Sequence, residues 1–437
     1  MRELQALIAV PSVSAQPAHA ADVRRCAAWL RDHLHGIGFP SSEVVATPGH
    51  PLVMAAWCAA PGAPTVLIYG HYDVQPVEPL SAWRSPPFSP LLRGADLFGR
   101  GASDDKGPLF VHLKACEAYL RTSGRLPVNV IVLLDGEEEI GSPNLGSILS
   151  TLCADVILVS DTRIPTPDQP ALTYALRGSL NLELTVRGQG IDLHSGAFGG
   201  AIHNPLQVLT DILASLHDRA GRIAVPGFYD HVAPARVSHG PTDAQVVQDA
   251  QASRGWGEPG YSLYERTTIR PALMITQVLG GSARSAIPSC ASARLNVRLV
   301  PDQHPEYVAA LLRRYVQRVT PPTVRSELRV SSAIGPVVVD RHDPYMRAAA
   351  RAYEHGFGAP PHLLRSGGTI PAVRILRDTL GVPVVMMGFA LPDDRMHAAN
   401  EKFHLPVFFR GITTSTAFLA LAAQVYAGTP TWSTSAS

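Results

Sequence analysis

The chain has few cysteines, and they are unpaired. Five are scattered over 437 residues, and no two are spaced as Cys-x-x-Cys. An odd, scattered set predicts neither a disulfide framework nor a thiolate metal site, and it is typical of buried thiols in a reducing compartment. The first residues do not have the pattern of a signal peptide, because Glu3 stands where positive charge is expected and Pro11 interrupts a short apolar stretch. We therefore expect a cytoplasmic protein.

The sequence also lacks an excess of charge of either sign and lacks a long apolar run. Its 37 Lys and Arg residues balance 36 Asp and Glu residues, giving a formal net charge of +1. This balance offers no argument for binding nucleic acid or an anionic membrane. No uninterrupted apolar run approaches the roughly 18 residues that a membrane span needs. The length instead indicates a globular protein of two domains.

The first 174 residues alternate short apolar strands with helical patterns. Residues 65–69, 128–134 and 156–159 are rich in β-branched side chains, as in strands buried on both faces. A helical pattern before the second of them ends at Gly124. This alternation predicts an α/β domain whose central sheet is mostly parallel and flanked by helices.

The pattern changes near residue 175 and returns after Pro336. Residues 180–187 alternate apolar and polar side chains, which predicts a strand with one wet face, and residues 295–299 repeat the alternation. Two helical segments, 205–216 and 305–319, accompany these strands. We therefore expect an α+β module at 175–335 inserted into a catalytic domain made of residues 1–174 and 336–437.

Histidine and acidic residues follow the predicted parallel strands. His71 and Asp73 come after the first strand, three consecutive glutamates at 137–139 after the second, and Asp161 after the third. Ligands of open α/β sheets bind beyond the carboxyl ends of the strands. A further acidic pair, Asp104 and Asp105, begins the helix that connects two of the strands.

Carboxylates gathered this closely repel one another unless some are protonated or a cation lies among them. Imidazole and carboxylate ligands without thiolates suit Zn²⁺, Mn²⁺ or Co²⁺, and two ions sharing a carboxylate would account for the number of acidic groups. Each piece alone has another explanation: a surface turn for His71 and Asp73, a solvated helix start for 137–139, and a helix cap for Asp104. Spacing alone leaves both interpretations open.

Six ordered motifs carry a more specific signal. They are YGHYDVQP (69–76), GRGASDDKG (99–107), DGEEEIGS (135–142), LHSGAFGG (193–200), SGGTIP (366–371) and HAANEK (397–402). These motifs and their order resemble those of the M20 family of metallopeptidases, and within it the carnosinase-like branch of cytosolic non-specific dipeptidases. The resemblance extends over nearly the whole chain. It implies hydrolysis of the amide bond of dipeptides or similar short peptides by metal-activated water.

The resemblance also implies a set of metal ligands. In that family the corresponding residues hold two divalent ions, here expected to be Zn²⁺, with Mn²⁺ or Co²⁺ as alternatives. One ion would be bound by His71 and Asp161, the other by Glu139 and His397, and both by Asp104.

The remaining catalytic roles follow from the same motifs. The Glu-Glu-x-Gly-Ser motif aligns with residues 138–142, so Glu138 would be the general base, and Glu137 falls outside the motif. Asp73 resembles the carboxylate that fixes the tautomer of a histidine ligand.

The inserted module resembles the family's lid domain, which in this branch also forms a homodimer. His194 matches the lid histidine that reaches a neighbouring subunit's site and stabilises the oxyanion. Arg298 resembles the arginine that binds the substrate carboxylate. Ser285 and Thr369 each keep a hydroxyl where relatives often carry the other hydroxyl residue, so both are expected to contact the substrate.

Two departures from the branch leave the substrate open. Ser366 stands where relatives have a glutamate, and no histidine occurs between residues 324 and 340, where carnosinase-like enzymes tend to place one. The partner is therefore expected to be a small peptide or an acyl amino acid, and an N-acyl-amino-acid deacylase with the same metal centre remains the alternative. A non-catalytic peptide-binding relative would be expected to lack a ligand or the base. A serine hydrolase is disfavoured because no G-x-S-x-G motif occurs.

Overall fold

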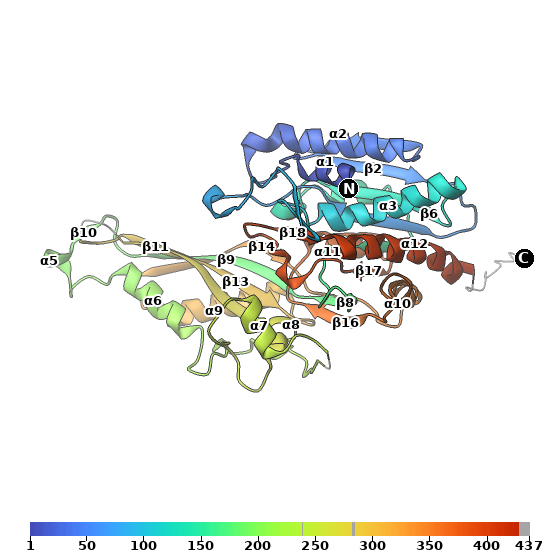
Figure 1. Ribbon diagram of the computed structural model, residues 1–437. Coiled ribbons are helices and arrows are strands. Elements are labelled where there is room, and N and C mark those ends of the chain that lie inside the picture. Colours follow the sequence, from blue (N-terminus) through green and yellow to red (C-terminus); the bar gives the residue numbers. More distant parts are fainter. Residues whose placement is uncertain (238, 282–284, 428–437) are drawn as a thin grey trace, which may run out of the picture. The chain divides into compact units, whose positions relative to one another are not determined.

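The computed structural model describes residues 1–237, 239–281 and 285–427, and the chain divides into two compact units. Unit 1 comprises residues 1–174, 339–364 and 370–437, and unit 2 comprises residues 175–338 and 365–369. Unit 2 is thus inserted into unit 1, as Figure 1 shows by the colour change along the chain.

Unit 1 is built on a mixed sheet with a parallel centre. The strand order is β1 (Ser41–Val45), β2 (Leu52–Trp57), β6 (Asn129–Asp135), β3 (Thr65–His71), β7 (Val156–Val159), β17 (Val384–Met387) and β8 (Ala171–Leu176). The four strands from β6 to β17 run parallel, and β1, β2 and β8 pair antiparallel. Strand β16 (His362–Ser366) also pairs with β8. The last two residues of β8 belong to unit 2, and there they pair with β15 (Val337–Val338). The predicted α/β class is confirmed, with antiparallel strands at the edges.

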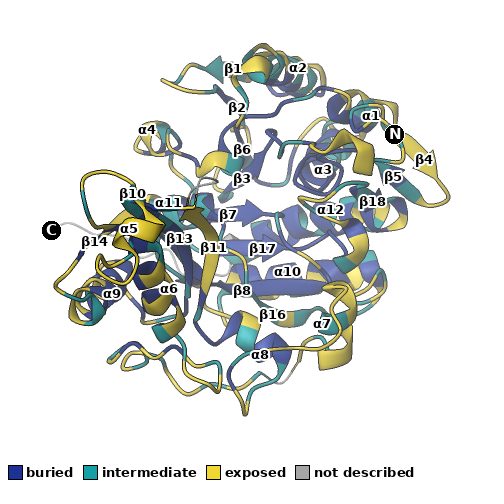
Figure 2. Ribbon diagram, turned by 90° about the vertical axis from the view of Figure 1, so that its left-hand side faces the viewer, coloured by how far each residue is buried: buried dark blue, intermediate teal, exposed yellow. Residues whose placement is uncertain are grey.

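Helices cover both faces of this sheet, as Figure 2 shows. One face carries α1 (Arg2–Ile8), α2 (Ala20–Gly36), α3 (Lys106–Ser123), α12 (Leu405–Ala427) and α10 (Pro344–Phe357). The other face carries α4 (Gly146–Leu149) and α11 (Pro371–Leu380). Strands β3, β7 and β17 are therefore buried from both sides, which explains their apolar composition.

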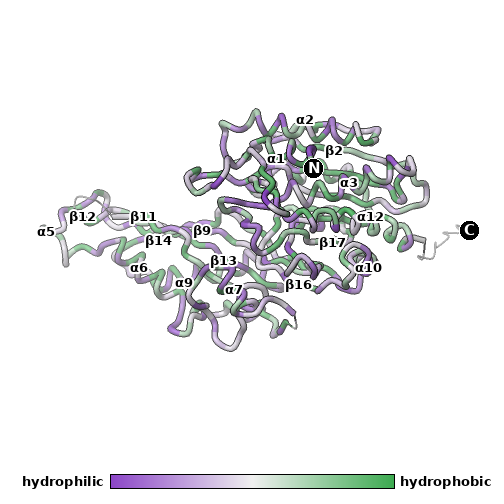
Figure 3. The backbone as a smooth tube through the Cα atoms, viewed as in Figure 1, coloured by the Kyte–Doolittle hydropathy of each residue, from purple (hydrophilic) through white to green (hydrophobic). Residues whose placement is uncertain are grey.

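Helix α12 is long and apolar enough, by length and composition, to cross a membrane, and its hydrophobic character is visible in Figure 3. More than half of the apolar window Leu405–Val425 is buried inside the protein. The helix packs against α3 and α10. These contacts are those of a core helix of a globular domain.

A small antiparallel sheet brings two distant motifs together. It has the order β18 (Lys402–His404), β5 (Asp96–Phe98), β4 (Leu91–Arg93). Lys402 pairs with Phe98, so the segment ending at residue 402 lies beside the segment that begins at Gly99.

Unit 2 has an antiparallel sheet in the order β11 (Ala272–Gly280), β13 (Cys290–Leu299), β9 (Gly178–Arg187), β14 (Arg325–Ile334). Helices α6 (Pro205–Ser215) and α9 (Pro305–Val319) pack on one face over a core of alternating strand residues. Short elements complete the unit: β10 (Leu193–His194) paired with β12 (Ala286–Ile287), α5 (Ser195–Phe198), α7 (Asp243–Asp249) and α8 (Leu263–Thr268).

Candidate metal centre

Three neighbouring parallel strands deliver the candidate residues to one edge of the unit 1 sheet. His71 is the last residue of β3, whose neighbours are β6 and β7. Glu138 and Glu139 lie in a 3-10 turn (Glu138–Ile140) just after β6, and Asp161 lies two residues after β7. Parallel strands end at the same edge, so these side chains converge.

Asp104 joins two groups of candidate ligands. In one group, ligand atoms of His71, Asp104 and Asp161 lie within 4.8 Å of one another, and in the other the same holds for Asp104, Glu139 and His397. Asp104 Oδ1 lies 3.1 Å from Nε2 of His71, and its Oδ2 lies 2.8 Å from Nε2 of His397. Each group offers imidazole nitrogen and carboxylate oxygen, the donors that zinc and its neighbours bind.

Asp73 contacts both His71 and the turn that carries Glu138 and Glu139. Nδ1 of His71 lies 3.0 Å from the main-chain oxygen of Asp73, so Nε2 is the nitrogen that faces Asp104. The Asp73 carboxylate accepts hydrogen bonds from the main-chain N–H groups of Glu138 and Glu139, both at 3.1 Å, and from the Ser14 hydroxyl at 2.6 Å. Asp73 thus orients His71 through its main-chain oxygen and holds the turn that carries the two glutamates through its side chain.

The crowding of acidic groups raises several pKa values. Burial, reinforced by the charges of Glu139 and Asp73, raises the pKa of Glu138 to about 8. Burial and the neighbouring Asp104 raise the pKa of Asp161 well above its usual range. Burial likewise raises the pKa of Asp105 to about 8, and its Oδ1 has no hydrogen-bond partner. Glu138 and Asp161 are half-buried and Asp105 is fully buried, and such crowded carboxylates fit a site that receives positive charge.

The two histidines supply that charge in the metal-free chain. Burial opposes ionisation of His71, yet its hydrogen bonds to Asp104 and Asp73 raise its pKa well above the usual value. Hydrogen bonds to Asp104 and Glu139 raise the pKa of His397 to about 10. Burial alone would raise the pKa of Asp104, but its bonds to both histidines lower it instead. Cations held by the same atoms would displace these protons, so the donor set fits two divalent ions.

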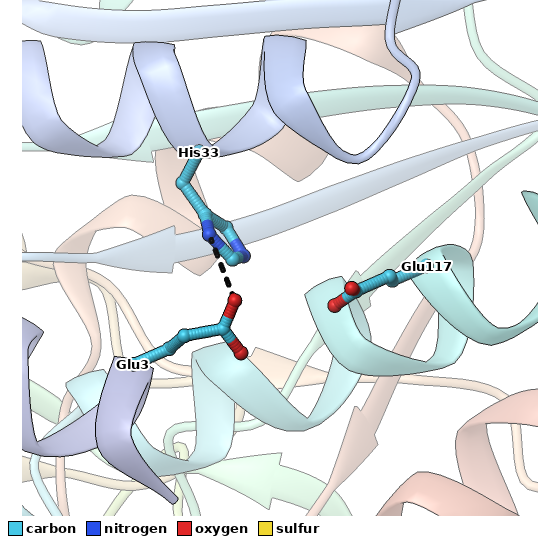
Figure 4. A group of neighbouring side chains, drawn as sticks. All are labelled: Glu3, His33 and Glu117. Carbon is cyan, nitrogen blue, oxygen red and sulfur yellow. Dashed lines mark ion pairs between the residues drawn. The ribbon is translucent and has the colours of Figure 1, made fainter. Parts of the chain in front are cut away.

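A third group of ligand-type side chains lies elsewhere in unit 1, where Glu3 of α1, His33 of α2 and Glu117 of α3 face one another (Figure 4). Lys114 already forms ion pairs with both glutamates, and Arg121 Nε lies 2.5 Å from Glu117. Both carboxylates are therefore neutralised by basic side chains, and we interpret this group as an ion-pair network.

The remaining predicted residues belong to unit 2. His194 caps α5: its Nδ1 accepts a hydrogen bond from the N–H of Gly196 at 3.0 Å, which leaves Nε2 as the donor of the neutral ring. Arg298 on β13 donates to the Thr369 hydroxyl at 3.0 Å, which brings these two residues together. Ser285 is exposed and has φ 54°.

Some contacting side chains were not among the predicted site residues. Ser14 donates to Asp73, Gln75 donates to Glu139 at 2.7 Å, and Glu401 accepts from the backbone of the Asp104 loop. Gln75 and Glu401 lie inside recognised motifs, so their polar side chains beside assigned ligands were the available signal. Ser14 lies in no motif, and no pattern in the sequence connects it to Asp73.

The chain matches a known family of peptidases over most of its length. The profile described as Peptidase family M20/M25/M40 matches residues 67–421. The chain belongs to this family of peptidases, which confirms the predicted resemblance and the enzyme class of metallopeptidase.

Individual relatives cover nearly the whole chain. The Cys-Gly metallodipeptidase DUG1 of Candida albicans is 29% identical, over 96% of this chain and 93% of its own length. The Beta-Ala-His dipeptidase of Homo sapiens is 28% identical, over 98% and 90%. The crystal structure of human carnosine dipeptidase 1 aligns with a TM-score of 0.85 at 26% identity, covering 97% of this chain and 95% of that one. The likeness extends through both units.

Proposed function

We propose that this chain is a dipeptidase that uses two divalent metal ions. We expect both to be Zn²⁺, with Mn²⁺ or Co²⁺ as alternatives. The observation that carries the proposal is Asp104, whose two carboxylate oxygens each face a different histidine and which is common to both ligand groups. A carboxylate common to both ligand groups would suit a pair of ions, which in two-metal sites lie about 3.5–4 Å apart.

The ligands are divided between the two ions. His71 and Asp161 would hold one, Glu139 and His397 the other, and Asp104 both. When bound, such ions supply Lewis acidity toward the scissile carbonyl and lower the pKa of a water molecule between them.

Glu138 is the general base of the proposal. It adjoins the ligand Glu139, and its main-chain N–H donates to Asp73, which fixes the backbone that carries its carboxylate. The pKa of Glu138, raised by burial to about 8, suits a group that takes a proton from water near neutral pH and returns it to the leaving amine.

Residues of unit 2 would bind the substrate. Nε2 of His194 is free of the capping bond and can donate to the developing oxyanion, in the site of a second copy of the chain. Arg298 would bind the substrate carboxylate, with Thr369 and Ser285 as further contacts. A homodimer through this unit is supported by β11, an edge strand whose apolar Ile275, Val278 and Leu279 are exposed.

The substrate class comes from the relatives. Those named for a substrate are dipeptidases, acting on Cys-Gly or on Beta-Ala-His, so we propose unmodified dipeptides, with acyl amino acids as the alternative. The five cysteines are all free, which supports a cytoplasmic location.

Replacing Glu138 by glutamine tests the mechanism. The variant should lose roughly 10²–10⁴-fold in kcat, because the amide accepts no proton, while metal analysis finds both ions still bound. A variant that keeps a tenth of wild-type kcat would show that Glu138 is not the base.

A substrate panel separates peptidase from deacylase. The kcat/KM values for dipeptides should exceed those for the N-acetyl and N-succinyl derivatives of the same amino acids. The opposite order would assign the chain to the deacylases and would leave the proposed metal centre unchanged.

A further inference from the structure

The carboxylate of Glu401 is fully buried and surrounded by donors from one short loop. Its Oε2 accepts from Nη1 of Arg100 at 2.7 Å and from the N–H of Gly101 at 3.0 Å. Its Oε1 accepts from the N–H groups of Ser103 at 2.9 Å and Asp104 at 3.1 Å. Three of the four donors are thus main-chain groups of the segment that ends at the shared ligand.

The partners of Glu401 connect three of the recognised motifs. The main chain of Asp104 is held by Glu401, while its side chain faces His71 and His397. Nη2 of Arg100 donates to the main-chain oxygen of Pro76 at 3.1 Å, in the loop that follows His71. Glu401 itself lies four residues after His397. The Arg100–Glu401 pair is therefore where the loops carrying His71, Asp104 and His397 meet.

The segment before Glu401 has a backbone that needs support from outside. Arg395, His397 and Asn400 have φ values of 60°, 62° and 64°, in the left-handed region that side chains other than glycine rarely adopt. Asn400 is bonded through its side chain to the main chain of Ala82 and Arg84, and the main-chain oxygen of Glu401 accepts from Gly99. The position of His397 thus depends on bonds at the end of its own loop.

We propose that Glu401 is a positioning residue that sets the Asp104 and His397 loops at the separation the two metal ions need, before either ion binds. The inference rests on the proposed function for the identity of the ligands. If Glu401 served stability alone, its ion pair with Arg100 would be sufficient, and the three main-chain bonds would not be needed. The three main-chain donors bind to a full negative charge, so each bond is stronger than its neutral counterpart and fixes the loop as well as the charge.

The first test compares Glu401→Gln with Glu117→Gln. Both glutamates are buried in unit 1 and paired with an arginine, but Glu117 lies in the separate ion-pair network of Figure 4. The Glu401 amide keeps the shape but puts an N–H group against N–H donors, so the affinity for Zn²⁺, measured by competition with a chelator, should fall roughly 10–100-fold.

Glu117→Gln should bind Zn²⁺ with an affinity within about twofold of that of the wild type. This should hold even if its thermal stability falls by as much as that of Glu401→Gln. The Co²⁺ absorption spectrum of Glu401→Gln should also change, since ligand geometry sets it. Wild-type affinity and an unchanged spectrum in folded Glu401→Gln would overturn the inference.

A second test needs no variant. In the metal-free wild-type chain the amides of Ser103 and Asp104 should exchange their hydrogens as slowly as that of Leu67 in the buried strand β3. Fast exchange that slows only after Zn²⁺ is added would mean that metal, not Glu401, organises the loop. A wild-type chain that binds no Zn²⁺ would contradict the proposed function instead.

Discussion

At the scale of single residues, the candidate centre is a set of ionisable groups with shifted pKa values. Glu138 and Asp105 have pKa values raised to about 8 from ordinary values of 4.5 and 3.8, mainly by burial. Hydrogen bonds to carboxylates raise the pKa of His397 from 6.5 to about 10. The folded metal-free chain therefore keeps protons that the unfolded chain releases.

This difference predicts how stability changes with pH. Between pH 6.5 and 8 these groups bind more protons in the folded metal-free chain than in the unfolded one, so their contribution to stability falls as pH rises through the raised pKa values. Burial lowers the pKa of His112 to about 3, which acts in the opposite sense in this window but is outweighed by the several raised groups. The lowered pKa of Asp104 acts in the opposite sense, but only in acid outside this window. Thermal unfolding of metal-free protein should give a lower Tm at pH 8 than at 6.5. Zn²⁺-loaded protein, the control, should show a smaller fall, and a metal-free Tm that rises over this interval would contradict the assignment.

Part of the site follows from position in the sequence. His71 ends the apolar strand β3 and Asp161 lies two residues after β7, and the carboxyl ends of neighbouring parallel strands must meet. His397 has no such signal: it lies in an irregular loop with φ 62°, and only its motif distinguishes it from the other histidines. Long-range loop contacts such as that of Asp104 with His397 leave no periodicity in a sequence.

At the scale of elements, α3 must approach two loops of the centre closely. A Cβ added to Gly107 would lie 2.1 Å from the main-chain oxygen of Ala102 and 2.5 Å from the ring of Phe403. Ala102 precedes Asp104 by two residues, and Phe403 follows Glu401 by two. The glycine therefore allows the helix to begin between the two loops.

Gly107→Ala should lower the free energy of unfolding by about 1–3 kcal/mol, since neither loop can move away without disturbing the ligands. Urea unfolding measures the change. Gly36→Ala is the matched control, because nothing lies within 4 Å of its added Cβ at the end of α2, and it should be neutral or slightly stabilising. Equal effects of the two changes would contradict the close-packing argument.

The elements themselves were predicted best where burial is regular. Strand β7 and helix α9 occupy the predicted residues, and α3 ends where Gly124 adopts φ 69°. Strand β14 was not predicted, because most of its side chains are exposed and it has no apolar stripe. The antiparallel pairing of β1 with β2 likewise depends on contacts that the local sequence does not specify.

At the scale of the whole molecule, the proposed dimer makes each site depend on two chains. If His194 acts in the partner's site, Glu138→Gln and His194→Ala chains carry complementary defects. Mixing the two inactive variants with subunit exchange should restore about a quarter of wild-type activity, since half of the dimers are mixed and each has one intact site. Each variant alone is the control. No recovery, despite exchange shown by mass spectrometry, would place His194 in its own chain's site.

The central claim is that two ions act together at the Asp104 centre, and metal titration tests it most directly. Exhaustively chelated protein should have no dipeptidase activity, and addition of Zn²⁺ should restore it with a break at two ions per chain. Asp104→Ala protein, titrated in parallel, should neither reach that stoichiometry nor regain activity. Activity that survives complete removal of metal, or full activity at one ion per chain, would contradict the account.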